Sequence, residues 1–493
     1  MSLLSELYGH SLALLTDLYQ LTMAHACWKS GLAEREAVFH LFFRKHPFEG
    51  GFTVACGLEH AVAYMQELRF GEADRAYLES LAGADGKPLF DRGFLEWLGR
   101  LAFSCDVDAV PEGTVVFPQE PLVRVKGPVA LCQLLETPLL NLVNFQTPIA
   151  TKAARICLAA RGQPVLEFGL RRAQGIDGAL SASRAAYAGG CAATSNVLAG
   201  KLFGIPVRGT HAHSWVMLFD EEKEAFRQYA RAMPNNCVFL VDTYNTLDGV
   251  RRTVEVGKWL REQGQEMVGV RLDSGDLAYL SSEARKILDE AGFPEAAVLA
   301  SNDLDEHTIE SLKDQHAAIA VWGVGTRLVT GHDEPALGGV YKLGAVREDG
   351  VWRYRVKLSE QAAKISNPGV LQVRRFSHER GFEADAIYDE ERPPAGPWAI
   401  VDPLDPTRRK QLAQGAPCED LLVPVFRAGR LVYEPPPLSR IRERVVAQLA
   451  GLHSGVKRFL NPHSYPVGLE ESLHETKTQF VMQARGSAGR QGS

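Results

Sequence analysis

Hydrophobic and polar positions follow two different rhythms along the chain. Residues 14–30 carry apolar side chains at helical spacing, with Asp17 and Gln20 near the start and Gly31 after the end, which predicts a helix. An apolar run over 37–44 predicts a strand.

The next segments complete a first domain. Residues 105–127 hold short β-branched runs broken by proline and glycine, which predicts antiparallel strands with tight turns, and 129–161 has a helical pattern. We therefore expect residues 1–150 to form an N-terminal α/β domain.

From residue 165 onward the pattern changes to short apolar strands, each followed by a helical stretch. The predicted strand ends lie 23 to 41 residues apart, which is the pace of successive βα units with a parallel sheet buried on both faces. These ends are 166–169, 207–210, 240–243, 270–274, 300–303 and 322–326.

Six such units predict an α/β fold with a (β/α) barrel over 151–365, whose chemistry lies at the C-terminal ends of the strands. An open doubly wound sheet is the alternative, and it places ligands at the same ends. The pattern becomes loop-rich afterwards, and we expect residues 366–493 to pack on the N-terminal domain and complete it.

The composition and net charge limit the classes of molecule that the chain is expected to bind. A chain of 493 residues is too long for one core, and 45% hydrophobic and 23% charged residues are typical of a globular protein. The net charge of −6 gives no general attraction to nucleic acid or anionic membrane, so a bound anion needs a local basic cluster.

Cysteine usage and the N-terminal sequence predict a cytoplasmic protein. The eight cysteines are scattered without a Cys-x-x-Cys pair, which favours free thiols in a reducing compartment. The first residues show no basic stretch followed by an apolar run, and no segment approaches 18 uncharged apolar residues.

Polar and charged side chains gather at the predicted strand ends. One alone, such as Asp303, would be explained as a helix cap, but six consecutive polar ends indicate a site for an anionic substrate and a metal. The set is Glu167, Arg171, Arg172, Thr210, His211, His213, Asp242, Arg271, Asp273, Asp276, Asn302, Asp303 and Arg327.

Two glycine motifs, 321–327 and 337–343, lie late in the barrel order. Glycine lets backbone N–H groups approach an anion closely, and loops after the last strands are the usual phosphate site of a barrel, although plain tight turns would also need glycine. The predicted phosphate contacts are Gly323, Gly325, Thr326, Gly338 and Gly339.

The segment 271–276 offers a cation and acids together. Strand alternation places Arg271 and Asp273 on one face, where arginine can pair with a phosphate and the acid can hold a divalent ion or ribose hydroxyls. With Ser274 they form a predicted phosphate-binding set, and Asp273 is the candidate ligand of the divalent ion. The alternative is an Arg–Asp ion pair that closes the barrel mouth.

His211 and His213 admit two interpretations. Histidines at i and i+2 of a strand share a face and could chelate zinc in a metal-dependent barrel hydrolase. That interpretation needs further ligands on later strands, where histidine occurs only at His307 and His316, in or after a helix. A neutral imidazole could instead accept a phosphoryl group.

Six ordered segments resemble the signature segments of the nicotinate phosphoribosyltransferases. The resemblance covers residues 14 to 469. The segments are 15–23, 167–175, 209–214, 241–246, 271–276 and 461–469.

The resemblance implies an ATP-dependent enzyme of the ligase class in the first step of NAD salvage from nicotinic acid. It would join nicotinate to 5-phosphoribosyl 1-pyrophosphate, giving nicotinate mononucleotide and pyrophosphate, with Mg²⁺ or Mn²⁺ as metal. It also implies that the (β/α) barrel is irregular and has an α/β partner domain. The resemblance further implies a homodimer with shared active sites, in which the helix bearing Tyr19 comes from the partner.

Carried over by position, His213 is the family's phosphohistidine, and Tyr19 would stack on the pyridine ring. Ser366 matches a hydroxyl that contacts the donor, although threonine often stands there. The motif does not decide whether Arg171 or Arg172 faces the site. The positions expected to hold the nicotinate carboxylate or nearby phosphates are Arg171, Thr210 and Arg327.

The acceptor is expected to be nicotinate. Nicotinamide-using relatives carry an acid just after the residue that matches Thr210, whereas this chain has His211, which would not repel a carboxylate. Quinolinate enzymes are much shorter chains. A barrel-shaped binding protein without catalysis is the alternative from another class, and intact His213, Asp273 and Arg327 argue against it.

Overall fold

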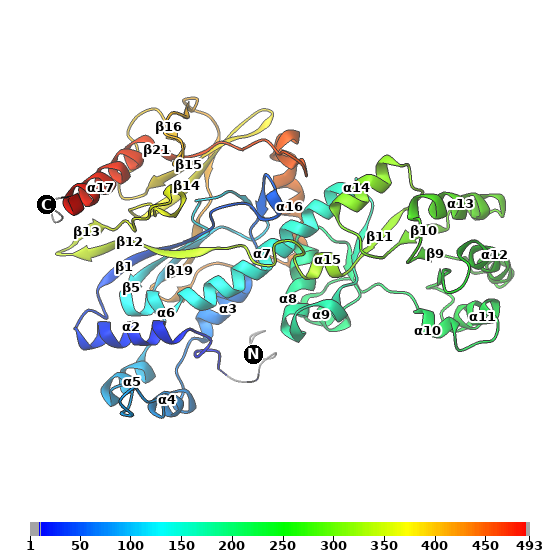
Figure 1. Ribbon diagram of the computed structural model, residues 1–493, viewed down its shortest axis with the longest axis horizontal. Coiled ribbons are helices and arrows are strands. Elements are labelled where there is room, and N and C mark those ends of the chain that lie inside the picture. The colour runs from blue at the N-terminus through cyan, green and yellow to red at the C-terminus, as the bar shows by residue number, and fades with distance from the viewer. Residues whose placement is uncertain (1–8, 10, 490–493) are drawn as a thin grey trace. The chain divides into compact units, whose positions relative to one another are not determined.

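The computed structural model describes residue 9 and residues 11–489, and the chain divides into two compact units. Unit 1 takes the chain up to Pro148 and again from Ala336, and unit 2 is Ile149–Pro335. Figure 1 labels the helices and strands of both units.

Unit 2 is built on one six-stranded sheet in the order β7-β6-β11-β10-β9-β8, in which every pairing is parallel. Helices alternate with these strands along the chain (Figure 1). The strands are β6 (Val165–Glu167), β7 (Ala193–Thr194), β8 (Val238–Leu240), β9 (Gly269–Leu272), β10 (Ala297–Ala300) and β11 (Val321–Val324). The helices are α8 (Gly175–Ala188), α9 (Val197–Phe203), α10 (His213–Val216), α11 (Glu222–Ala232), α12 (Thr246–Glu262), α13 (Leu277–Glu290), α14 (Glu306–Asp314) and α15 (Thr326–Val329).

The parallel α/β architecture expected from the sequence is confirmed. Within the described ranges no ladder joins the outer strands β7 and β8, so the barrel is irregular in that it is not closed by hydrogen bonds. The strands are short and apolar, as β10 illustrates with three of its four residues buried.

Several polar residues at the strand ends cap the following helices. The side chains of Asn196, Asn245, Asp276 and Asp305 accept hydrogen bonds from the first turns of α9, α12, α13 and α14. Asp276 therefore belongs to the architecture of α13.

One predicted strand was wrong. Residues 207–210 form only an isolated bridge, from Val207 to Thr194, because the segment carries Arg-Gly-Thr and continues into a loop. The strand beside this bridge is β7, which was not predicted from the sequence, because its two residues are too few to leave a hydrophobic pattern.

Unit 1 contains a seven-stranded sheet in the order β13-β12-β1-β5-β3-β19-β20, a six-stranded sheet in the order β17-β16-β21-β15-β14-β18, and the pair β2-β4. The first sheet comprises β1 (Glu36–Phe42), β3 (Asp106–Ala109), β5 (Val123–Pro128), β12 (Val340–Glu348), β13 (Val351–Tyr354), β19 (Val423–Arg427) and β20 (Arg430–Leu431). The second comprises β14 (Leu371–His378), β15 (Gly381–Asp389), β16 (Ala399–Val401), β17 (Arg409–Gln411), β18 (Cys418–Asp420) and β21 (Val467–Glu470), and the pair is Thr53–Val54 with Val115–Val116.

The helices of unit 1 surround these sheets. Helix α6 packs on β1 and β5, and α2 packs on α6, so that Leu21 and Ala24 of α2 are buried. The helices are α2 (Leu18–Lys29), α3 (Leu58–Glu67), α4 (Glu72–Glu79), α5 (Arg92–Arg100), α6 (Val129–Leu134), α16 (Leu438–Gly451) and α17 (Glu471–Gly489). Helix α7 (Glu136–Ala159) begins in unit 1 and continues into unit 2.

Two expectations about unit 1 need correction. The predicted barrel boundary at 365 differs from the division at 335, because β12 pairs with β1 and so places 336–365 in unit 1. The stretch after 366 is not mainly loops, since β14 and β15 form a long antiparallel pair there. The tail returns to the N-terminal part through β19, which pairs with β3.

No helix in the described part of the chain is long and apolar enough to cross a membrane.

Candidate active site

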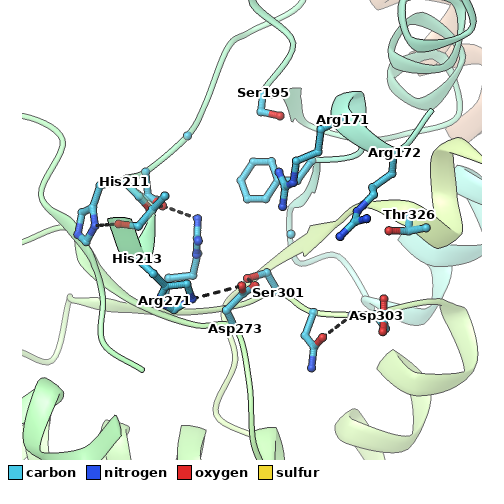
Figure 2. Close-up of a pocket in the computed structure, with 17 residues that line it drawn as sticks. Arg171, Arg172, Ser195, His211, His213, Arg271, Asp273, Ser301, Asp303 and Thr326 are labelled. Atoms are coloured by element: carbon cyan, nitrogen blue, oxygen red, sulfur yellow. Dashed lines mark hydrogen bonds and ion pairs between the residues drawn. The ribbon is translucent and has the colours of Figure 1, made fainter. Parts of the chain in front are cut away.

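A cavity of about 560 Å³ opens at the C-terminal ends of the unit 2 strands. Figure 2 shows Arg171 and Arg172 extending toward it across from His213 and Arg271. Three arginines and two aspartates line the cavity, so its wall is positive overall. The lining residues are Phe168, Arg171, Arg172, Ser195, Gly209, Thr210, His211, Ala212, His213, Arg271, Asp273, Ser301, Asn302, Asp303, Gly323, Gly325 and Thr326.

Glu167, at the end of β6, lies beneath this cavity and does not line it. Its buried carboxylate accepts hydrogen bonds from the Gly169 backbone N–H, from Ser183 Oγ at 2.8 Å and from Thr194 Oγ1 at 2.5 Å. The carboxylate therefore ties β6 to α8 and β7, and it fixes the turn that carries the arginines.

Arg171 and Arg172 lie on the short helix η2 (Leu170–Arg172), and both line the cavity. Both residues are exposed, and within the described residues neither guanidinium forms an ion pair or hydrogen bond. The sequence left open whether Arg171 or Arg172 faces the site. In the structure both side chains are available to an anion.

Arg271 is the third cation, and it is mostly buried. Its Nη1 donates to Thr210 Oγ1 at 2.5 Å, while its Nε is buried without a hydrogen-bond partner. Burial lowers the pKa of Arg271, and the carboxylates of Asp273 and Asp242 oppose that shift. An anion in the cavity would supply the partner that Nε lacks.

His211 is buried and neutral. Its Nε2 accepts a hydrogen bond from the Leu240 backbone N–H at 3.2 Å, so Nδ1 carries the proton, 3.3 Å from the Ala212 carbonyl oxygen. Burial lowers the pKa of His211 to about 4, with smaller contributions from Arg271 and His213. Its ring lies edge-on to Tyr229 at 4.7 Å.

His213 is the more accessible imidazole, with 41% of its side chain exposed. It begins helix α10, its Nδ1 lies 3.1 Å from Thr243 Oγ1, and its Nε2 lies 3.9 Å from Asp273 Oδ2. The expected shared strand face of His211 and His213 was wrong, because 211–213 is a loop entering a helix. With Nε2 of His211 occupied, the pair cannot chelate zinc.

Asp242 organises the segment that holds Asp273. One carboxylate oxygen accepts from the Asp273 backbone N–H at 2.9 Å and from Ser274 Oγ at 2.6 Å, and the other is buried without a hydrogen-bond partner. Asp273 itself accepts a hydrogen bond from Ser301 Oγ. Ser274 is thus engaged by Asp242 and does not line the cavity.

Gly323 makes room for an aromatic side chain. A Cβ at this position would lie 2.8 Å from the Phe168 ring, so only glycine lets the ring lie against β11. Sequence reasoning singled out Gly323 for phosphate and missed Phe168, Ser195 and Ser301. Phe168 lies inside the Glu-Phe-Gly motif, so that motif was the available signal.

Arg327 was predicted at the site but does not line the cavity. Its Nη1 donates to Asp305 Oδ2 at 2.6 Å, and Asp305 also caps α14. The guanidinium is therefore committed to holding α15 against the start of α14.

Four other predicted residues belong to unit 1. Tyr19 lies on α2 with 48% of its surface exposed, and Gly338 has a positive φ of 68°. The Gly339 backbone N–H donates to Asn144 Oδ1 at 3.1 Å, and Ser366 is buried, with Oγ accepting from the Lys357 backbone N–H at 2.8 Å. Gly339 and Ser366 are thus engaged within their own unit.

A cluster of three cations in unit 1 was not predicted from the sequence. Burial and the neighbouring charges of Arg44 and Lys357 lower the pKa of Lys342, while Glu136 opposes the shift. Nε of Arg44 is buried without a hydrogen-bond partner. The three cations come from 44, 342 and 357, which only the folded sheet brings together.

Three family models match the chain in order. The nicotinate phosphoribosyltransferase N-terminal domain matches residues 14–144, the nicotinate phosphoribosyltransferase family model matches 164–365, and the C-terminal domain matches 372–477. The nicotinate phosphoribosyltransferase of Bacillus subtilis is 44% identical over 96% of this chain and 96% of its own. The chain belongs to the nicotinate phosphoribosyltransferase family.

More distant members agree over the same length. The human nicotinate phosphoribosyltransferase is 36% identical over 93% of this chain and 95% of its own. A crystal structure of the human enzyme superposes with a TM-score of 0.82 over 94% of this chain and 99% of that one, at 34% identity. The members of this family are enzymes. The chain is therefore an enzyme, and the alternative of a binding protein without catalysis is excluded.

Proposed function

We propose that the chain joins nicotinate to 5-phosphoribosyl 1-pyrophosphate in the unit 2 cavity, releasing nicotinate mononucleotide and pyrophosphate. The single observation that carries the proposal is the cavity itself, which three guanidiniums and one phenylalanine line at the strand ends. The names of the relatives point to the same reaction.

The acceptor is proposed to lie between Phe168 and the arginines. An aromatic face suits a pyridine ring, and Arg171 or Arg172 can pair with the carboxylate as a fork. Neutral His211 adds no negative charge beside Thr210, so nothing there repels an anionic acceptor. These features favour nicotinate over nicotinamide.

The donor is proposed to bind against Arg271, the 323–326 loop and Asp273. The reaction breaks the bond from ribose C1′ to the pyrophosphate oxygen while the pyridine nitrogen forms a bond to C1′. The transition state gains positive charge at C1′ and negative charge on pyrophosphate, so positioning and charge stabilisation supply most of the catalysis. Arg271, whose Nε lacks a partner, is placed to neutralise the leaving group.

A magnesium ion fits beside Asp273. Magnesium binds through one or two carboxylates plus substrate phosphates, and Asp273, which lines the cavity, is the carboxylate that would hold it. When bound, the metal would neutralise pyrophosphate charge. Among the described residues no three His, Cys, Asp or Glu side chains converge, so the zinc hydrolase has no ligand set.

ATP is proposed as the co-substrate, with His213 as its phosphoryl acceptor. The imidazole is exposed in the cavity and close to Asp273, so a phosphoryl group there would add a dianion beside the proposed metal site. Nitrogen forms the bond to the γ-phosphorus as ADP leaves, and water later releases phosphate and restores the imidazole.

Unit 1 is proposed to supply the remaining contacts in a homodimer with shared sites. Tyr19 offers an exposed aromatic ring, and the Arg44, Lys342 and Lys357 cluster near Ser366 offers cations for phosphates. Gly338 stays a candidate phosphate contact. Gly339 and Arg327 are weaker candidates, because each already forms a hydrogen bond elsewhere. A cytoplasmic location stays a prediction from the sequence.

A product assay tests the proposal. The purified chain is incubated with donor, Mg²⁺ and ATP, and with nicotinate or nicotinamide in parallel reactions, and the mononucleotides are separated by chromatography. We expect nicotinate mononucleotide and pyrophosphate in equal amounts, with nicotinamide far poorer. Product from nicotinamide alone, or no product with substrate binding retained, would overturn the proposal.

A further inference from the structure

A second cavity, of about 640 Å³, lies within unit 1 and has no part in the proposed reaction. The end of α3, helices α4 and α5, and the β19–β20 hairpin form its wall. Helices α4 and α5 lie side by side in Figure 1. Its apolar surface comes mainly from Met65, Leu68, Phe70, Phe103, Phe426 and Leu431.

The charged residues of the lining are two arginines, Arg69 and Arg75, and the lining includes no carboxylate. Within the described residues neither guanidinium forms an ion pair, and Nε of Arg75 is buried without a hydrogen-bond partner. A buried donor left without a partner costs free energy, and a bound anion would recover it.

Glycines fix the shape of this cavity. A Cβ on Gly99 would lie 2.8 Å from Nε and 2.9 Å from Cζ of Arg75, so the guanidinium lies directly on the α5 backbone. A Cβ on Gly429 would lie 2.0 Å from the Phe103 carbonyl oxygen, so the hairpin packs closely against the segment after α5. Phe103 and Phe426 meet edge to face at 5.0 Å. The wall is therefore preformed.

We propose that this cavity binds a small amphipathic anion, with an apolar body against the aromatic wall and a carboxylate, sulfonate or phosphate head on Arg69 and Arg75. The volume lies within the range of ligand pockets, and apolar walls with a few fixed polar groups are typical of them.

The test uses 8-anilinonaphthalene-1-sulfonate, an aromatic anion whose fluorescence rises in apolar surroundings. We expect saturable binding to the full-length protein, with the Kd raised at least about tenfold in Arg75→Gln, since the substitution removes the charge and its charge-assisted hydrogen bond. Octanoate should displace the probe, while octanol at the same concentration should not. Gly99→Ala should also weaken binding by displacing the guanidinium.

The matched control is Arg92→Gln, which removes an exposed arginine of α5 that pairs with Glu96 at 3.6 Å. It should leave the Kd unchanged. Arg69→Gln alters the exposed cation and keeps the test usable should Arg75→Gln fold poorly. Unchanged binding in the Arg69, Arg75 and Gly99 variants, or equal displacement by octanol and octanoate, would overturn the proposal.

Discussion

His211 and His213 stand two positions apart and differ in what their imidazoles can do. Both nitrogens of His211 are engaged, and burial lowers its pKa to about 4, so it remains neutral near pH 7. His213 is exposed in the cavity, beside Thr243 and Asp273. One histidine therefore shapes the pocket, and the other is available for chemistry.

The neutrality of His211 leads to a specificity prediction. In His211→Asp, a carboxylate near the acceptor should lower kcat/KM for nicotinate at least about tenfold, because like charges a few ångströms apart cost about 1–4 kcal/mol. The ratio of kcat/KM for nicotinamide over nicotinate should rise. His211→Asn keeps an acceptor oxygen without charge and is the control, and an identical ratio in both variants would contradict the explanation.

At the scale of elements, the end of β8 organises the site. The Leu240 backbone N–H holds His211, Asp242 holds the segment of Asp273 and Ser274, and Thr243 contacts His213. Glu167 does the same at the end of β6. These contacts hold the end of β8 to the end of β9, and the end of β6 to the end of β7.

Glu167 should therefore matter for folding as well as for activity. Glu167→Ala leaves the Gly169 backbone N–H and the Thr194 hydroxyl without their acceptor, whereas Ser183 Oγ keeps the Ala179 carbonyl oxygen at 3.0 Å, so we expect the substitution to lower the free energy of unfolding by about 2–4 kcal/mol. Urea unfolding followed by circular dichroism measures this. Glu290→Ala, at an exposed position ending α13, should change it by less than about 0.5 kcal/mol. Equal effects of Glu167→Ala and Glu290→Ala would contradict the role of Glu167 in joining β6 to α8 and β7.

Elements with strong periodicity were predictable, and those that depend on distant pairing were not. The βα units from 165 to 326 follow from local pattern, except the strand predicted at 207–210, and the cavity residues Arg171, Arg271 and Asp273 follow from their places near the ends of β6 and β9. Thr210 and His213 also line the cavity, but from a loop and from the start of α10. β7 has two residues and leaves no pattern. The commitment of Arg327 to Asp305 depends on a side-chain pairing that spacing does not encode.

At the scale of the whole molecule, one buried histidine links the two large sheets of unit 1. His40 of β1 accepts a hydrogen bond from the Leu371 backbone N–H of β14 at 3.1 Å through Nε2. Burial, with a contribution from Arg124, lowers the pKa of His40 to about 3. The assignment of 336–365 to unit 1 also depends on pairing between distant segments, here β12 with β1, which the local hydrophobic pattern could not reveal.

The low pKa of His40 makes stability depend on pH. Below the ordinary pKa of 6.5 the unfolded chain binds a proton that the folded chain does not bind until about pH 3, so acid favours unfolding. The free energy of unfolding should fall by up to about 1.4 kcal/mol per pH unit for this histidine between about pH 6 and pH 4. Urea titrations at several pH values measure it.

The variant His40→Gln supplies the comparison, because its amide oxygen can accept from Leu371 without titrating. The pH slope of its unfolding free energy should be smaller by about one proton. An unchanged slope would show that His40 is not the group responsible.

The central claim is that His213 couples ATP to nicotinate mononucleotide synthesis. The most direct measurement is the ratio of ATP hydrolysed to mononucleotide formed, in the unmodified chain and in His213→Ala. We predict that the variant loses ATP hydrolysis and ATP stimulation while slow ATP-independent synthesis persists. Unchanged stimulation by ATP in His213→Ala would contradict the account.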